Sequence, residues 1–270
     1  MAVPFDVLIN IIEKHFPISC AYDWDNSGIQ LKLSDEVSGV LIALDLTPMV
    51  VQEAIDKGCD MILTHHPALF RHVKKLVIDD PVTGTVLKAA KAGISIYSAH
   101  TSCDCAPEGL NYELAKVLSL RSPEIFAIDG CQHESGGLGV KGLLHKKMNE
   151  TELIEHIKTS LGVSSVRCAG IKGEFEKIAV IGGSAGEFYA EAVKQGIDVL
   201  ITGEAKHNEF VEAYVSGVLL IAAGHYDTEK MFLNLAERKI RQTIIDEGCS
   251  LKVEIAYTGD LVTFAAARGT

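Results

Sequence analysis

The chain has 270 residues, of which 47% are hydrophobic and 23% charged, a composition typical of a soluble globular protein with a substantial core. Its formal charge of −11 argues against a nucleic-acid backbone as the main partner, because phosphates are bound by clustered lysines and arginines. The seven cysteines include no Cys-x-x-Cys pair, so the sequence indicates neither a zinc ribbon nor a thioredoxin motif.

The N-terminal segment predicts an amphipathic helix within residues 1–17. Its apolar positions have helical spacing and are Phe5, Leu8, Ile9 and Ile12. The segment has no basic flank and is therefore not interpreted as a signal peptide. No apolar run approaches the roughly eighteen residues that a membrane span needs. We therefore expect a cytoplasmic protein without a membrane partner.

Strands and helices then alternate along the chain. A turn is predicted at Trp24–Gln30, which contains the only tryptophan. The elements expected after it are a strand at 40–44, a helix at 48–57, a strand at 61–63, a helix at 82–92 and a strand at 94–98. This alternation predicts an α/β protein with a parallel or mixed sheet covered by helices.

The strand at 61–63 leads to two adjacent histidines, His65 and His66, followed by Pro67. Proline cannot donate to a sheet ladder, so the strand should end here with both imidazoles at its carboxyl end. In α/β sheets this end is where ligands bind. The pair is either a metal site or two partly buried histidines that are satisfied by hydrogen bonds.

The pattern weakens between residues 121 and 150. Within it, Ser135–Gly139 predicts a flexible turn or a close approach of the backbone. A helix is expected at 151–161 and a strand at 178–181. The glycine-rich residues 182–186 lack the spacing of a dinucleotide-binding loop, so we interpret them as a tight turn bordering a cleft.

An internal repeat connects the two halves of the chain. Residues 54–64 align without a gap on residues 192–202, and residues 93–100 resemble residues 217–225 with one insertion. In both halves a strand ends in a histidine that is followed four residues later by a carboxylate. These pairs are His100/Asp104 and His225/Glu229. Two diverged copies of one α/β unit explain the pattern, and chance similarity between generic units is the alternative.

Each copy places candidate metal ligands at the carboxyl ends of two strands. They are His65, His66, His100 and Asp104 in the first copy, and Glu204, His225 and Glu229 in the second, where Gly203 and Glu204 match the His pair. Residues i and i+4 share a helix face, so His225 and Glu229 could bind one ion. Even three of these histidines with two of the carboxylates exceed one tetrahedral site, which favours two ions. These ligand types suit zinc, iron, manganese, cobalt or nickel.

Three further residues have two readings each. Cys103 and Cys105 flank Asp104 and are either extra ligands or side chains that face elsewhere. His207 is either a hydrogen-bond donor near the cleft or part of a solvated helix face.

Five motifs occur in a fixed order, and they are Trp24–Gly28, Leu63–Pro67, His100-Thr101 with Asp104, Ile201–Glu204 and Gly224–Glu229. Together they resemble the NIF-three-like (YbgI-like) family, whose members often carry the name GTP cyclohydrolase 1 type 2 homologue. The resemblance covers nearly the whole chain. It implies two similar α/β lobes with mixed sheets that face each other across a metal cleft. It also implies self-association into a toroidal homohexamer.

On this resemblance, residues 1–120 form the first lobe, with part of the C-terminus packing on it, and residues 176–270 form the second. The connecting segment at 121–175 is too short for the ferredoxin-like domain that some longer relatives insert, so the compact form of the fold is expected.

The resemblance also implies a set of metal ligands for two divalent transition-metal ions per chain. They are His65, His66, Asp104, His225 and Glu229, with Asp104 as the bridging residue. The two cysteines around Asp104 depart from the family pattern. The predicted function is a dinuclear-metal-dependent hydrolase of a small, nucleotide-like substrate, with His100 or Glu204 as general acid or base. The rival hypothesis is a non-catalytic metal-binding, metal-trafficking or regulatory scaffold protein.

Overall fold

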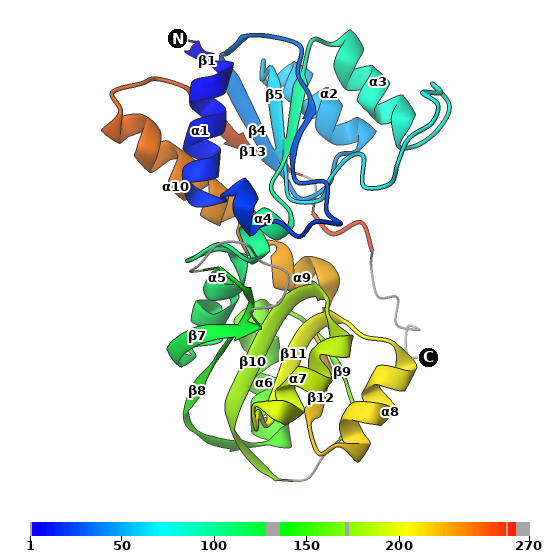
Figure 1. The fold of residues 1–270 in the computed structure, drawn as a ribbon, viewed down its shortest axis with the longest axis vertical. Helices are drawn as coiled ribbons and strands as arrows, with labels where there is room; N and C mark the ends of the chain where they lie inside the picture. The colour runs from blue at the N-terminus through cyan, green and yellow to red at the C-terminus, as the bar shows by residue number, and fades with distance from the viewer. Residues whose placement is uncertain (1, 128–135, 171–172, 258, 263–270) are drawn as a thin grey trace, which may run out of the picture.

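The computed structural model describes residues 2–127, 136–170, 173–257 and 259–262, which form two lobes, one above the other in Figure 1. The first lobe has a five-stranded sheet in the order β13-β4-β5-β6-β2. Its strands are β2 (Gly28–Leu31), β4 (Gly39–Ala43), β5 (Met61–Thr64), β6 (Ser95–Ser98) and β13 (Lys252–Ile255). The first four strands of this order are parallel, and β2 is antiparallel to β6. A separate pair joins β1 (Val3–Pro4) to β3 (Glu36–Val37).

The second lobe has a six-stranded mixed sheet in the order β7-β8-β10-β11-β12-β9. Its strands are β7 (Arg121–Ala127), β8 (Leu138–Asn149), β9 (Arg167–Cys168), β10 (Glu174–Ser184), β11 (Val199–Glu204) and β12 (Leu219–Ala222). The central strands β10, β11 and β12 are parallel, and the other three are antiparallel to their neighbours.

Helices cover both faces of each sheet. The first sheet lies between α1 (Phe5–His15) with α10 (Met231–Asp246) on one face and α2 (Pro48–Asp56) with α3 (Thr83–Lys91) on the other. The second lies between α5 (Leu110–Val117) with α6 (Glu150–Leu161) and α7 (Tyr189–Lys194) with α8 (His207–Val215). Successive strand residues serve opposite faces, so Ile42 and Leu63 pack toward α1 while Leu41 and Ile62 pack toward α2. The remaining short helices are η1 (Ile18–Cys20), α4 (Thr101–Asp104), η2 (Gly186–Phe188) and α9 (His225–Glu229).

The predicted helices begin and end close to where local chemistry places them. Thr47 caps α2 by accepting a hydrogen bond from Val50 N, and Pro48 occupies the first turn. Asn149 and Glu152 form a capping box at the start of α6, and Gly162 ends that helix in the left-handed conformation. The predicted helices at 48–57, 82–92 and 151–161 are therefore confirmed to within a residue or two.

The sequence repeat is also a structural repeat. Asp60 accepts hydrogen bonds from the backbone N–H groups of Ser38 (2.9 and 3.0 Å) and Gly39 (3.1 Å), ahead of β4. At the matching positions of the second copy, Asp198 accepts from the N–H groups of Glu176 (2.9 Å) and Lys177 (2.8 Å) in β10. Strands β4, β5 and β6 are parallel neighbours in that order, as are β10, β11 and β12. The expectation of two similar α/β lobes with mixed sheets is thus confirmed.

The segment between residues 121 and 150 is more regular than its pattern predicts. It contains β7 and β8, which lie at one edge of the second sheet. The outer half of β8 is solvated and rich in lysine, so its apolar alternation is interrupted. Ser135 lies outside the described residues, whereas Gly139 in β8 has a φ of +73° and approaches Val180 O so closely that a Cβ would lie 2.9 Å from it. The predicted close approach of the backbone is therefore confirmed at Gly139.

The chain passes between the lobes twice. It enters the second lobe between α4 and α5, and it returns from α9 through α10 to β13, which pairs with β4 in the first sheet. The residues between 121 and 175 supply β7, β8, α6 and β9 to the second lobe. The domain limits expected at residues 120 and 175 stay a prediction. Within the described ranges, none of the helices combines the length and the apolar character that crossing a membrane requires.

Candidate metal centre

The candidate site lies where the two lobes meet, at the carboxyl ends of the parallel strands. His65 and His66 follow β5, and His100 follows β6 directly before α4. His225 and Glu229 are the first and last residues of α9, which follows β12 of the second lobe. The predicted convergence of strand ends from both copies is therefore present in the structure.

His65 is fully buried and held in one orientation. Its Nδ1 lies 2.9 Å from the carbonyl oxygen of Ala99, to which it donates a hydrogen bond. That bond directs Nε2 into the cluster, where burial lowers the pKa of the ring but the carboxylates of Asp104 and Glu229 outweigh it and raise the pKa above its usual value. Nε2 lies 3.7 Å from Asp104 Oδ1 and 3.7 Å from Glu229 Oε1. One imidazole nitrogen thus faces carboxylates from both lobes.

His66 and His225 face each other across the lobe boundary. Their Nε2 atoms are 3.2 Å apart, and Glu229 Oε2 lies 3.0 Å from the first and 3.1 Å from the second. On the far side of each ring, His66 Nδ1 contacts Asp45 Oδ1 at 2.8 Å and His225 Nδ1 lies 3.4 Å from Glu204 Oε2. A carboxylate behind each ring orients the other nitrogen toward a common point, as in metal-binding histidines.

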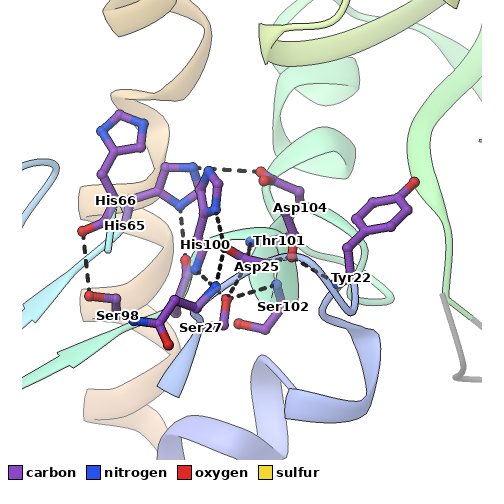
Figure 2. Close-up of polar contacts among 12 residues, drawn as sticks. Tyr22, Asp25, Ser27, His65, His66, Ser98, His100, Thr101, Ser102 and Asp104 are labelled. Atoms are coloured by element: carbon purple, nitrogen blue, oxygen red, sulfur yellow. Dashed lines mark hydrogen bonds and ion pairs between the residues drawn. The ribbon is translucent and has the colours of Figure 1, made fainter. Parts of the chain in front are cut away.

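His100 forms a dyad with a carboxylate from the N-terminal turn. Its Nδ1 contacts Asp25 Oδ1 at 2.7 Å. The other oxygen of Asp25 accepts hydrogen bonds from Thr101 N at 3.1 Å and Thr101 Oγ1 at 2.6 Å, at the start of α4. Figure 2 shows His65, His66 and His100 side by side with Asp104 facing them. Asp25 therefore fixes both the imidazole of His100 and the helix that carries Asp104.

The buried polar atoms of the cluster fit a metal ion. His65 Nε2 and Asp104 Oδ1 are buried and form no hydrogen bond with a described residue, and Glu229 Oε2 is buried between the Nε2 atoms of His66 and His225. Ligand atoms from His65, His66 and His100 lie within 4.8 Å of one another, as do those from His66, His225 and Glu229. Leaving buried polar atoms without partners is costly, and a cation among them would remove that cost. The cluster could therefore hold a metal ion.

The charges of the cluster are strongly coupled. Burial lowers the pKa of His66, but the carboxylates of Asp45 and Glu229 outweigh it and raise the pKa to about 10. Burial raises the pKa of Glu229, but the neighbouring imidazoles hold it well below its usual range. The pKa of Asp104 is raised because burial outweighs the attraction of His65 and His100. In the metal-free protein, protons on imidazoles take the place of a cation.

Two clefts open on either side of the His66–His225 pair. The first, of about 860 Å³, also reaches Asp104, His100 and Glu229, and residues 182–185 border it. The second, of about 670 Å³, is lined by Asp45, Glu204 and both histidines of the pair. The glycine-rich segment borders the cleft as predicted, but the predicted tight turn is wrong, because Gly182–Ser184 are the last residues of β10 and Gly186 begins η2. A small molecule in the first cleft would lie directly against the cluster.

Comparison with known proteins agrees with this geometry. The family model described as Duf34/NIF3 (NGG1p interacting factor 3) matches residues 4–259. The chain belongs to the DUF34/NIF3 family. Among its relatives, a GTP cyclohydrolase 1 type 2 homolog of Clostridium acetobutylicum is 31% identical, over 95% of this chain and 96% of that protein. A protein NIF3 homolog of Schizosaccharomyces pombe is 29% identical, over 92% and 93%.

Solved structures of similar proteins share the fold. A Staphylococcus aureus hypothetical protein is 30% identical and superposes with a TM-score of 0.89, over 97% of this chain and 99% of that chain. A Bacillus cereus protein related to NIF3 superposes with a TM-score of 0.90 at 22% identity, with the same coverage. The predicted NIF-three-like fold is thereby confirmed.

Three of the predicted positions in this DUF34/NIF3 chain lie apart from the cluster. Cys103 packs in the apolar core of the first lobe, where burial raises the pKa of its thiol, and neither it nor Cys105 belongs to the two ligand groups found among the described residues. His207 is exposed at the start of α8 and lines a separate groove beside Arg167. The reading of His207 as part of a solvated helix face is the one that the structure supports.

Two carboxylates of the DUF34/NIF3 site were missed in the sequence. Asp45 follows β4 by two residues just as His66 follows β5, so the rule that found the histidines would also have found it. Asp25 lies in an Asp-Asn-Ser-Gly stretch, which the sequence alone predicts only as a turn, because these residue types are common in turns. Its contact with His100, 75 residues away, depends on how β2 pairs with β6.

Two glycines explain why the two copies of the internal repeat in this DUF34/NIF3 chain differ next to the metal cluster. Gly203 occupies the position that His65 holds in the first copy, and a Cβ there would lie 2.8 Å from His225 Cα and 2.6 Å from Gly183 O. A Cβ on Gly183 would lie 2.4 Å from Glu229 Oε1. The absence of both side chains lets α9 approach β10 and β11, which brings His225 and Glu229 to the lobe boundary.

Proposed function

We propose that the chain is a metal-dependent hydrolase of a small, nucleotide-like substrate. Its dinuclear centre would be held by His65, His66, Asp104, His225 and Glu229. The observation that carries the proposal is the group of buried nitrogen and oxygen atoms without hydrogen bonds at the floor of an open cleft. The name GTP cyclohydrolase 1 type 2 homolog, carried by relatives at 31% and 34% identity, supports the substrate class.

The donor set fits two divalent transition-metal ions such as zinc, iron, manganese, cobalt or nickel, because it combines imidazoles with carboxylates and no thiolate. Bound ions would supply Lewis acidity and a water molecule of lowered pKa. Asp104 and Glu229 each lie 3.7 Å from His65 Nε2, which makes either carboxylate able to bridge. The Asp45, Asp25 and Ala99 contacts hold three imidazoles in orientation before any ion binds.

His100 is the better of the two candidates for general acid or base. It lines the larger cleft together with Asp104, and its Nδ1 is fixed by Asp25, so its Nε2 is free to exchange a proton with a substrate. Glu204 lines the opposite cleft, and its side chain is 61% exposed and faces His225 Nδ1. Glu204 therefore acts by orienting His225.

The test is chromatographic turnover of GTP and a panel of nucleotides, nucleosides and bases by protein reconstituted with each candidate metal. Asp104→Asn keeps the size of the side chain but removes its charge, and Asp79→Asn on an exposed loop is the matched control. Product that disappears with Asp104→Asn and persists with Asp79→Asn supports the proposal. Absence of turnover by protein with a full metal content would refute it in favour of a non-catalytic metal-binding role. Assembly into a toroidal homohexamer stays a prediction, which light scattering tests.

A further inference from the structure

Three rings form a corner at the mouth of the larger cleft. Trp24 and Phe70 have ring centroids 6.2 Å apart at 78°, Trp24 and His100 lie 6.3 Å apart at 74°, and Phe70 and His100 lie 6.0 Å apart at 89°. We call these three residues the aromatic corner. All three line the same cleft as Asp104 and Glu229. Because the His100 ring is 5.3 Å from His65 and 5.7 Å from His66, the corner adjoins the metal cluster directly.

The aromatic corner is held in place although its two largest rings are exposed. Trp24 is 62% and Phe70 52% exposed, which is high for large apolar side chains. Tyr22 stacks on Trp24 at 5.5 Å and 17°. Asn26 Nδ2 donates to Leu69 O at 2.8 Å, and Leu69 N donates to Gln30 Oε1 at 3.2 Å, so the two loops that carry Trp24 and Phe70 are joined. Exposed rings on fixed loops are suited to stacking against a planar ligand.

The charges of this cleft do not suit a triphosphate. No lysine or arginine is found among the described residues that line it, whereas Asp104, Glu187 and Glu229 contribute carboxylates. Arg71 and Lys74 line a neighbouring groove on the other side of Phe70, and they are not among the residues that line the cleft itself. A triphosphate carries several negative charges and is normally bound by clustered cationic side chains or backbone N–H groups. The walls of the cleft are suited to an uncharged ring.

We infer that the aromatic corner stacks the planar heteroaromatic ring of the substrate, and that this substrate is a nucleobase or nucleoside rather than a nucleoside triphosphate. The inference rests on the proposed function, because it assumes that the cleft presents a small molecule to the metal cluster. In this arrangement Trp24 and Phe70 set specificity. His100 belongs to both the corner and the cluster, so a stacked ring lies beside the group proposed to exchange protons.

The test uses the only tryptophan of the chain as its own reporter. Zinc-loaded protein is titrated with guanosine, GTP and ribose 5-phosphate while Trp24 fluorescence is recorded. Phe70→Leu removes one ring of the aromatic corner. The matched control is Leu76→Ala, because Leu76 is also exposed on the loop between β5 and α3 but lies outside the cleft. Trp24→Leu removes the fluorophore, so its guanosine binding is measured by calorimetry. Zinc content and circular dichroism establish that each variant is folded and loaded.

We expect saturable quenching by guanosine, at least tenfold weaker binding of GTP and no quenching by ribose 5-phosphate. Loss of one stacking ring should weaken guanosine binding by roughly five- to hundredfold, whereas Leu76→Ala should bind as the wild type does. The inference is overturned if guanosine does not quench fully loaded protein, if Phe70→Leu binds it unchanged, or if GTP binds more tightly.

Turnover separates this inference from the proposed function. Guanosine binding that depends on Phe70, without turnover of any compound by any metal form, would refute the hydrolase and leave the stacking site established. Conversely, hydrolysis of a compound that has no aromatic ring would overturn the stacking inference and leave the hydrolase standing.

Discussion

Metal binding and protonation should compete at His66. Asp45 and Glu229 raise the pKa of His66 to about 10, so its imidazole is protonated at neutral pH in the metal-free protein. A metal ion requires the neutral ring and must displace that proton. Metal affinity should therefore rise with pH throughout the range below about 10. The stability of the metal-free protein should change in the opposite direction, because the charged His66 stabilises the fold fully below pH 6.5 and loses this effect as pH rises toward 10.

The size of the effect follows from the same pKa. A pH of 7 is about three units below the pKa of His66, so removing the proton from its ring costs about 4 kcal/mol. This cost weakens the apparent affinity for the metal ion roughly a thousandfold. An unperturbed histidine would weaken it less than about twofold at this pH. Each pH unit should change the affinity about tenfold through His66 alone. Asp45→Asn removes one of the two carboxylates and should therefore reduce the pH dependence.

Isothermal titration calorimetry measures this directly. Zinc is titrated into metal-free protein between about pH 6 and pH 8, in buffers of different ionisation enthalpy, and the slope of heat against that enthalpy gives the protons released. We expect at least one proton per ion bound by His66 and an affinity that increases about a hundredfold over the range. Zinc binding without proton release at pH 7, or with an affinity independent of pH, would show that His66 is already neutral and refute the reasoning.

Three further predictions concern stability and metal content. Asp60→Ala and Asp198→Ala should each lower the free energy of unfolding by about 1–3 kcal/mol, because each substitution leaves two backbone N–H groups without their carboxylate acceptor. Urea denaturation measures this change, and unchanged stability would contradict the prediction. Gly183→Ala should reduce zinc content because its Cβ would lie 2.4 Å from Glu229 Oε1, whereas Gly196→Ala, with a similar φ but nothing within 4 Å, should retain zinc. Removal of zinc with a chelator should lower the melting temperature of the protein. Zinc at a free concentration of a few hundred times Kd stabilises the folded state by about 3–4 kcal/mol. An equal melting temperature with and without zinc would indicate weak binding.

The elements that the sequence predicts best are those whose signal is local. Apolar runs such as 40–44 and 61–63 are buried on both faces of a parallel sheet, and the Gly and Pro residues beside them mark the ends of helices. Strand β8 is missed because one of its faces is solvated and glycines interrupt its pattern. Strand β2 is missed because it begins inside a turn sequence and acquires its register only from β6.

The residues of the candidate site also differ in whether a local sequence signal predicts them. The histidines stand out because each lies just beyond an apolar strand, and Asp104 and Glu229 stand out because each follows a histidine of the internal repeat by four residues. The partners Asp25 and Asp45 are specified by tertiary contacts, on which periodicity carries no information. Gly183 and Gly203 matter through space that they leave empty, which only the packed structure shows.

The two crossings of the chain between the lobes limit how the cleft can open. A single linker would allow one lobe to swing freely, but here residues 105–109 and the segment around Lys230 must bend together, so any hinge axis runs through both. Glu229, in contact with both His66 and His225, immediately precedes the return crossing. A swing of the lobes would therefore pull Glu229 away from one of its two histidines. We therefore expect a bound ion to resist opening of the cleft, because the same movement would separate its ligands on the two lobes.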